Sequence, residues 1–200
     1  MKRLSALLVL TGILVSGLAP AAQAQTPPPP NHKHYDTPAG FETPQPGKPI
    51  APRLQNLGVH TFPTSTKNGQ AQLFMNQGLN LVYAFNHAEA ARAFAEAARL
   101  DPGHAMAYWG QALVLGPNIN APMNPEDEPK ALELVRKAAA LKAGATARER
   151  AYIDALATRY TGKAEDRQAA DRAFARAMAK VVEQYPDDLD ARTIYAEALM

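Results

Sequence analysis

The sequence contains no cysteine, and it lacks the short motifs that many enzymes carry. Without cysteine there is no thiol nucleophile, and the chain must fold without disulfides. A serine-hydrolase Gly-x-Ser-x-Gly turn, a zinc-protease His-Glu-x-x-His motif and a glycine-rich phosphate loop are also missing from the sequence. Acidic residues such as Asp171 and Asp187 are expected at helix caps or on solvent-facing surfaces. We therefore expect neither enzyme activity nor a bound cofactor within these 200 residues.

The chain has no excess of one charge sign. It carries 21 Lys and Arg against 19 Asp and Glu, and removing an N-terminal segment with Lys2 and Arg3 leaves 19 of each. A neutral protein has no general electrostatic attraction for phosphate backbones or acidic lipids. Nucleic acid and acidic membranes are therefore not expected as partners.

Long apolar runs are rare, and the one at the N-terminus predicts a signal peptide. A basic start precedes the apolar stretch from Leu7 to Leu18, and residues 22–24 have the A-x-A spacing of a cleavage site. We expect a secretory signal over residues 1–24, cleaved after Ala24. A membrane span needs about 20 apolar residues, so a retained anchor is the less favoured alternative. The predicted protein is bacterial, periplasmic or secreted, with no stable membrane insertion after cleavage.

Proline is concentrated before the first predicted helix. Residues 25–66 hold ten of the 17 prolines, including Pro27 to Pro30, and show almost no apolar periodicity. Such a composition favours extended polyproline conformations and predicts a disordered tether. A spacer is favoured over a proline-rich ligand for a partner domain. The short apolar patch from Leu54 to Phe62 is a candidate for docking onto the first helix.

The pattern becomes helical from residue 67 onward, and residues 71–104 form the first of several similar units. Large apolar residues recur where two short antiparallel helices would face each other, and small residues fall where their backbones would approach closely. In chain order these are Phe74, Gly78, Leu81, Ala90, Phe94, Ala97 and Pro102. The order resembles the tetratricopeptide repeat, whose pattern runs aromatic-x2-L-G-x2-Y, then A-x3-F, then a closing proline.

Further units follow the first, so the expected fold class is all-α, a tetratricopeptide-type α-solenoid of antiparallel helix pairs over residues 67–200. Residues 105–142 form the second unit, with seven additional residues in the loop 116–124. Residues 146–186 form the third unit, which a capping box at Thr146 and Glu149 opens. The first helix of a fourth unit is expected over residues 188–200.

Five segments have a more specific pattern: residues 74–79, 84–90, 95–102, 105–110 and 116–123. They are similar to a group of exported bacterial tetratricopeptide proteins without an established activity, and the similarity covers about residues 54–200. The resemblance implies a longer protein with more repeats, and it supplies no reaction. In the final helix, Ile194 and Leu199 would have no second helix to cover them. We therefore favour a truncated chain, and a homodimer through the C-terminal helix is the alternative.

In tetratricopeptide arrays the first helix of each pair lines a concave groove that binds extended peptides or helices. On this sequence the groove would have an apolar and aromatic lining without Lys or Arg, so a basic clamp for a C-terminal carboxylate is not expected. The alternative is that these side chains pack against later repeats or against the N-terminal segment. The candidate groove residues are Gln72, Met75, Asn76, Leu79, Val82, Tyr83, Met106, Trp109 and Leu113.

A metal site is not expected from the histidines. His32 and His34 lie in the predicted tether, which cannot hold ligands in a fixed geometry. His87 and His104 mark opposite ends of one helix, roughly 25 Å apart at 1.5 Å per residue. These two side chains therefore cannot share a metal ion within one molecule.

The loop 116–124 is a second candidate binding region. Its candidate binding residues are Asn118, Asn120 and Met123. The alternating acidic residues of a calcium loop are missing from it. An ordered structural loop at the edge of the groove is favoured over a binding loop.

The favoured function is an exported scaffold that binds a protein or peptide partner through its concave groove. The alternative is the N-terminal part of a longer exported enzyme or metal-binding protein whose functional residues lie beyond residue 200. The identity of the partner does not follow from the sequence.

Overall fold

The computed structural model describes residues 47–162 and 167–200, which belong to one of the two units of the chain, residues 33–200. This described part is all-α, as predicted, and contains no β-sheet. None of its helices is long and apolar enough to cross a membrane. The predicted signal peptide and the tether up to residue 46 lie outside the described residues. The α-helices are α1 (Gly69–Tyr83), α2 (His87–Leu100), α3 (Ala105–Leu113), α4 (Glu128–Leu141), α5 (Ala147–Ala157), α6 (Arg167–Gln184) and α7 (Leu189–Ala198), with 3₁₀ turns η1 (Pro125–Asp127) and η2 (Lys142–Gly144) at the two ends of α4.

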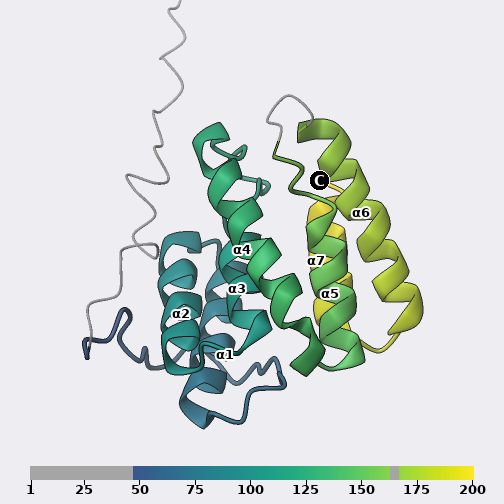
Figure 1. The fold of residues 1–200 in the computed structure, drawn as a ribbon. Coiled ribbons are helices and arrows are strands. Elements are labelled where there is room, and N and C mark those ends of the chain that lie inside the picture. Colours follow the sequence, from purple (N-terminus) through teal and green to yellow (C-terminus); the bar gives the residue numbers. More distant parts are fainter. Residues whose placement is uncertain (1–46, 163–166) are drawn as a thin grey trace, which may run out of the picture. The chain divides into compact units, whose positions relative to one another are not determined.

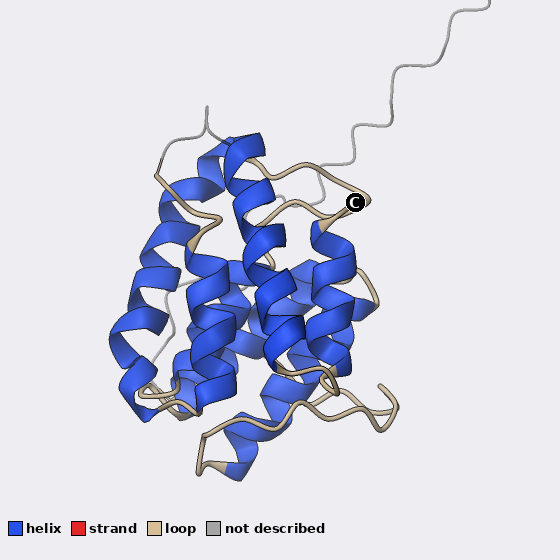
Figure 2. Ribbon diagram, turned by 90° about the vertical axis from the view of Figure 1, so that its right-hand side faces the viewer, coloured by secondary structure: helices blue, strands red, loops and turns tan. Residues whose placement is uncertain are grey.

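The helices pack as sequential pairs (Figures 1 and 2). α1 packs on α2, α3 on α4 and α5 on α6, and α7 packs on α6. α1 also contacts α3, and α3 contacts α5, so the first helices of successive pairs form one side of the array. The sequential packing of the helices is observed, whereas the predicted unit bounds 71–104, 105–142, 146–186 and 188–200 stay a prediction.

Side-chain caps fix where the helices begin. Asn68 accepts hydrogen bonds from two backbone N–H groups in the first turn of α1, at 3.0 and 3.2 Å. Thr146 and Glu149 form the predicted capping box of α5, and Asp188 caps α7. Such caps satisfy N–H groups that have no partner within the helix, and each contributes about 1 kcal/mol.

Two glycines allow the first three helices to pack closely on one phenylalanine. A Cβ atom added at Gly78 of α1 would lie 2.4 Å from Cε1 of the Phe94 ring on α2. One added at Gly110 of α3 would lie 2.5 Å from Cδ1 of the same ring. Carbon atoms do not approach so closely, so a side chain at either position would push a helix away from Phe94.

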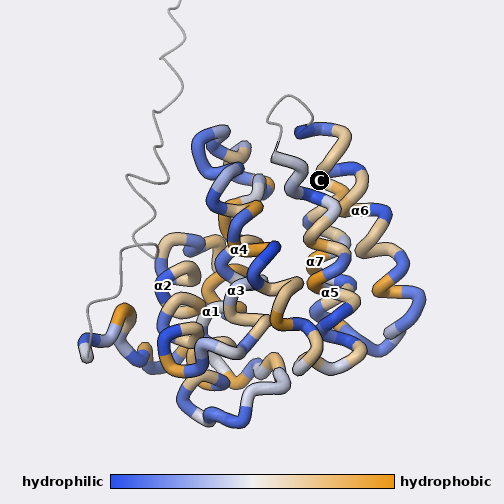
Figure 3. Tube along the Cα trace, viewed as in Figure 1, coloured by the Kyte–Doolittle hydropathy of each residue, from blue (hydrophilic) through white to orange (hydrophobic). Residues whose placement is uncertain are grey.

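The later helices show the usual amphipathic pattern, and Figure 3 shows apolar and polar residues alternating along them. On α6 the buried residues include Phe174, Met178 and Val181, which are spaced at helical intervals. Arg172 and Arg176 lie on the exposed face of the same helix. Burial of this apolar face holds α6 against α5 and α7.

Residues 50–66, here called the strap, lie against the helices. Phe62 is fully buried, whereas Val59 is 96% exposed, so only part of the predicted apolar patch docks. The Leu54 N–H donates to Gln77 Oε1 at 3.0 Å, which fixes the strap on α1. The predicted tether extends to residue 66, but the folded unit begins near residue 50, because the Ile50 N–H donates to Glu96 of α2 and the later strap backbone finds polar partners on α1.

Candidate functional site

The strap crosses the side of the array that α1, α3 and α5 form, and Phe62 anchors it there. The Phe62 ring stacks on Trp109 of α3, with ring centroids 6.0 Å apart. It also makes a T-shaped contact with Tyr152 of α5 at 5.7 Å. The guanidinium of Arg148 lies 5.1 Å from the centroid of the Phe62 ring. This cluster joins the strap, α3 and α5 into one apolar core.

Three side-chain amides on α1 bind the strap backbone, and we call them the amide ladder: Gln72, Asn76 and Asn80. Asn76 Oδ1 accepts a hydrogen bond from the Phe62 N–H at 3.0 Å, and Gln72 Nε2 donates to the Phe62 carbonyl at 2.8 Å. Gln72 Oε1 accepts from the Thr64 N–H at 2.9 Å. Asn80 Nδ2 donates to the His60 carbonyl at 3.2 Å.

The spacing of the amide ladder matches that of an extended chain. Positions four apart on an α-helix are separated by about 6.0 Å along its axis. Alternate residues of an extended chain are separated by about 6.6 Å. The strap runs antiparallel to α1, so its residues 60, 62 and 64 meet helix positions 80, 76 and 72. One face of a single helix thus provides hydrogen-bond partners for the backbone N–H and carbonyl groups of an extended segment.

The C-terminal end of the strap is bound to the start of α5. Glu149 is fully buried, and its Oε1 accepts a hydrogen bond from the Ser65 N–H at 2.7 Å. Its Oε2 accepts from the Thr146 N–H at 2.7 Å, which is the capping-box contact. One carboxylate therefore both caps α5 and holds the strap.

His104, at the start of α3, also faces the strap. Its Nε2 lies 3.1 Å from the Thr64 hydroxyl. That hydroxyl donates its proton to Gln72 Oε1 at 2.8 Å, so His104 is the donor in this contact. Burial lowers the pKa of His104, and the charges of Glu149 and Asp101 oppose that shift. A neutral His104 that carries its proton on Nε2 donates this hydrogen bond to the Thr64 hydroxyl.

The N-terminal end of the extended stretch reaches α7. His60 Nε2 lies 2.9 Å from Asp190 Oδ1, and the Tyr83 hydroxyl donates to the same oxygen at 2.7 Å. Burial and the Asp190 carboxylate hold the pKa of Tyr83 well above its usual range, so its hydroxyl remains a donor. These contacts connect the end of α1 with the start of α7.

Some of the predicted groove residues contact the strap, and Trp109 does so through the Phe62 ring. Gln72 and Asn76 bind the strap directly, and Tyr83 lies at its edge. The open groove that the sequence predicts is therefore covered over α1, α3 and α5, as in the alternative of packing against the N-terminal segment. The six apolar members that are buried are Met75, Leu79, Val82, Met106, Trp109 and Leu113.

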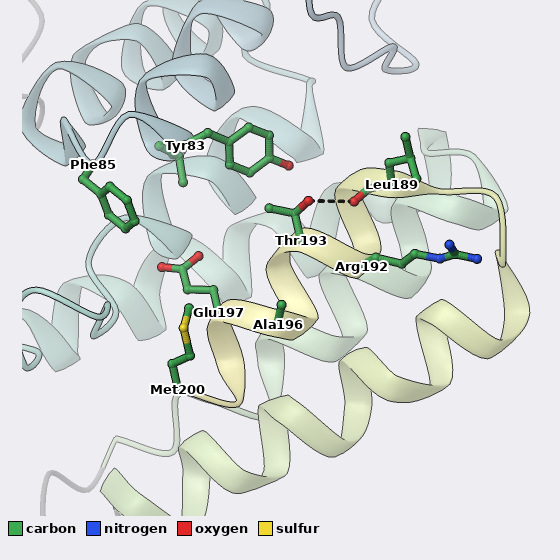
Figure 4. A pocket seen from close by; sticks show the side chains of 9 residues that line it. Tyr83, Phe85, Leu189, Arg192, Thr193, Ala196, Glu197 and Met200 are labelled. Carbon is green, nitrogen blue, oxygen red and sulfur yellow. Dashed lines mark hydrogen bonds between the residues drawn. The ribbon is translucent and has the colours of Figure 1, made fainter.

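An open pocket of about 580 Å³ lies between the end of α1 and α7, and we call it the α1–α7 pocket (Figure 4). Its walls are largely apolar, and several of its side chains are exposed: Phe85 is 50% exposed and Met200 is 72% exposed. Val82 and Tyr83 are the predicted groove residues that line it. The lining residues are Val82, Tyr83, Phe85, Leu189, Arg192, Thr193, Ala196, Glu197 and Met200.

Two charged side chains lie in the lining of the α1–α7 pocket, and they differ in their partners. Arg192 donates a hydrogen bond to the Pro186 carbonyl, and Figure 4 shows its side chain directed away from Glu197. The carboxylate of Glu197 has no hydrogen bond or ion pair within the described residues, and it extends from α7 toward the side of the pocket where Phe85 lies. Burial raises the pKa of the Glu197 carboxyl, and the charge of Arg159 opposes the shift.

Phe85 has an unusual backbone conformation. It follows the C-cap of α1 with φ at 57°, in the left-handed region that bulky side chains rarely adopt. Its N–H donates to the Val82 carbonyl, and the Asn86 N–H donates to the Leu81 carbonyl, both at 2.9 Å. These two bonds form a Schellman motif, in which glycine is the usual residue at this position. The chain places an exposed aromatic ring there instead.

The loop 116–124 is ordered by its own contacts. The Asn118 side chain donates to His87 Nδ1 at 3.0 Å, and its Oδ1 accepts from the Asn120 N–H at 2.8 Å. Met123 is buried, and its sulfur lies 3.1 Å from Nη1 of Arg167. Two of the three candidate binding side chains of this loop, Asn118 and Met123, thus contact other parts of the protein, whereas Asn120 is exposed.

No metal centre is found within residues 47–162 and 167–200. No group of three or more His, Asp or Glu side chains in these ranges is placed to hold a metal ion. His87 is buried at the start of α2 and His104 at the start of α3, at opposite ends of one helix as predicted. His32 and His34 lie outside the described residues.

Several residues of the site were not predicted. Of the amide ladder, Gln72 and Asn76 were predicted as groove residues, whereas Asn80 was not, although the three recur at intervals of four in the sequence. No sequence pattern marks Glu197, because only the folded structure shows that its carboxylate has no partner among the described residues. Phe85 occupies the usual glycine position after a helix, and this is visible once the helix end is known.

Comparison with known proteins adds no assignment to this site. No protein-family model matches the sequence, and neither a curated protein nor a solved structure matches it. What the site binds has to be inferred from its own residues.

Proposed function

We propose that this chain is an exported tetratricopeptide-type α-solenoid that binds a segment of a partner protein in the α1–α7 pocket. The sequential helix pairs and the contact of Gly78 with Phe94 support this class of protein. The signal-like residues 1–24 support export. Arrays of this class bind peptides on the side formed by the first helix of each pair. α1 and α7 are both first helices, and the pocket lies between them.

The strap occupies the rest of this side, and a partner is not expected to replace it. A competing segment would have to displace Phe62, whose burial contributes about 1.5–3 kcal/mol. It would also have to replace the backbone hydrogen bonds of the amide ladder. Because the strap is covalently attached, its effective concentration is about millimolar or higher. The open pocket requires no displacement and is therefore the favoured binding site.

The observation that carries the proposal is the exposed apolar lining of the α1–α7 pocket. Phe85 is half exposed although its left-handed conformation costs roughly 1–2 kcal/mol. A strained residue that presents an aromatic ring to solvent is typical of binding sites. Leu189 and Met200 extend the exposed apolar surface on the α7 side.

A random peptide library displayed on phage and selected on the full chain tests the proposal. Thr193→Trp fills the pocket from α7, and Thr158→Trp at the C-cap of α5 is the control. Both threonines are exposed, and both hydroxyls donate to a carbonyl of the preceding turn. We expect selected peptides with an apolar or aromatic residue, whose affinity falls at least tenfold with Thr193→Trp and is unchanged with Thr158→Trp.

Equal affinity of the selected peptides for both variants would place binding outside the pocket and contradict the proposal. Failure to select any peptide above background would contradict it as well. Circular dichroism of the two variants checks that the added indole has not unfolded the helices.

A further inference from the structure

We infer that the α1–α7 pocket selects a basic residue with an apolar neighbour, a Lys or Arg of the partner segment whose cationic group pairs with Glu197. This inference rests on the proposed function, because it names the chemistry of the segment that the pocket binds. It follows from the charge, the aromatic lining and the apolar area of the pocket.

The charge of the pocket is set by Glu197. Arg192 donates a hydrogen bond to the Pro186 carbonyl, so it does not neutralise the Glu197 carboxylate. Arg159 influences Glu197 at longer range, but its own guanidinium is bound to Asp171 at 2.8 Å. A half-buried carboxylate without a hydrogen-bond donor is unfavourable, and a ligand cation supplies the missing donor. Burial raises the pKa of the Glu197 carboxyl, and no donor to the carboxylate offsets this effect.

The aromatic lining favours the same ligand. The rings of Tyr83 and Phe85 lie on the α1 side of the pocket, opposite α7 (Figure 4). The face of an aromatic ring attracts a cation that lies within about 6 Å of its centre. A Lys or Arg side chain that reaches Glu197 would pass these rings, and its apolar stem would be covered by them.

The apolar lining of the pocket is not limited to the two rings on the α1 side. Leu189 and Met200 are exposed at opposite ends of α7, and both line the pocket. An apolar or aromatic residue next to the basic one would cover part of this surface. An acidic segment is disfavoured, because it would meet the unpaired carboxylate of Glu197.

Two peptides that differ in one charge test the inference. The probes are the acetylated and amidated pentapeptide Ala-Leu-Lys-Phe-Ala and its analogue with norleucine in place of Lys. Their affinities are measured by calorimetry for the unaltered chain, for Glu197→Gln and for Glu183→Gln. Glu183 is an exposed residue of α6 outside the pocket lining, so its substitution is a control for the loss of one negative charge.

We expect the Lys peptide to bind the unaltered chain and Glu183→Gln about tenfold more tightly than the norleucine peptide. With Glu197→Gln this advantage should disappear, because the pairing partner is lost. An advantage of the Lys peptide that persists with Glu197→Gln overturns the inference, and so does equal binding of the two peptides to the unaltered chain.

The outcomes also separate this inference from the proposed function. Library peptides that depend on Thr193 but contain no basic residue, with no effect of Glu197→Gln, overturn the inference and leave the proposed function standing. An absence of any pocket-dependent peptide overturns both. Sedimentation equilibrium identifies a second copy as the occupant: a dimer that dissociates with Thr193→Trp and excludes the Lys peptide overturns the inference.

Discussion

The Phe62 ring of the strap stacks on the Trp109 indole of α3, with centroids 6.0 Å apart and planes inclined by 19°. Trp109 is the single tryptophan of the chain, and it is almost fully buried. Its fluorescence therefore reports directly on whether the strap is in place. This contact makes the strap part of the folded core, since each ring helps to shield the other from water.

Replacement of Phe62 by alanine should loosen the strap. We expect Phe62→Ala to lower the free energy of unfolding by about 3–5 kcal/mol, as for other large-to-small changes in cores. The emission of Trp109 should move to longer wavelength as water reaches the indole. Urea denaturation followed by fluorescence measures both effects.

Val59→Ala is the matched control for this prediction, because Val59 lies in the same strap and is 96% exposed. It should change neither stability nor emission. An unchanged Trp109 spectrum with Phe62→Ala would show that the strap does not cover the indole in solution.

The amide ladder should contribute through hydrogen bonds to the strap backbone. Asn76→Ala removes the acceptor of the Phe62 N–H, which lies 3.0 Å away, and leaves that buried group without its partner. We expect a loss of about 1–3 kcal/mol in the free energy of unfolding. Amide hydrogen exchange should accelerate at Phe62 and Thr64, while the helices distant from the strap keep their protection.

Gln70→Ala is the control for the ladder, because Gln70 is an exposed amide at the start of the same helix. It should leave the exchange of the strap unchanged. If Asn76→Ala and Gln70→Ala accelerate exchange equally, the effect belongs to α1 itself and the ladder has no specific role.

The helices and their caps were predictable because their signals are local. Three helices begin at capping residues that can be read from a few neighbouring positions: Asn68, the capping box of Thr146 and Glu149, and Asp188. The close contact of Gly78 with Phe94 is also the one that the repeat pattern requires. The resemblance to tetratricopeptide proteins remains a prediction, whereas the sequential pairing of all-α helices is observed among the described residues.

The strap was predicted only as an apolar patch, because its stability depends on partners far away in sequence. Phe62 lies 14 positions from Asn76, and Ser65 lies 84 positions from Glu149. The prolines of residues 25–66 suggest one uniform tether, but in the structure residues 50–66 pack against the helices. Because the strap covers α3 and α5, the candidate groove shrinks to its α1–α7 end.

Phe85 offers a test in which stability and binding should respond differently. Glycine adopts the left-handed conformation at no steric cost, so Phe85→Gly should leave the free energy of unfolding unchanged or raise it by about 1 kcal/mol. The same change removes an aromatic wall of the α1–α7 pocket and should weaken pocket-dependent peptides at least fivefold. Thermal unfolding and calorimetry measure the two quantities on the same samples. A clear loss of stability together with unchanged binding would show that Phe85 is needed for packing alone.

The pH dependence of stability should show the contribution of His104. The pKa of this buried side chain is lowered in the folded protein, so the unfolded chain, with a histidine pKa of about 6.5, binds the proton more readily. The stability contributed by neutral His104 is therefore complete above that value and is lost as pH falls below it toward the folded pKa. Glu149 and Asp101 face the imidazole and reduce this loss without reversing it.

His104→Asn isolates this contribution, since asparagine keeps a favourable N-cap for α3 and has no proton to gain between pH 7 and pH 5. As the solution is acidified, the free energy of unfolding of the unaltered chain should fall relative to that of this variant. Denaturant titrations at intervals across that range measure the difference, and other titrating groups cancel because both proteins share them. If the unaltered chain loses no stability relative to the variant on acidification, or gains some, His104 is not held neutral by burial beside Thr64.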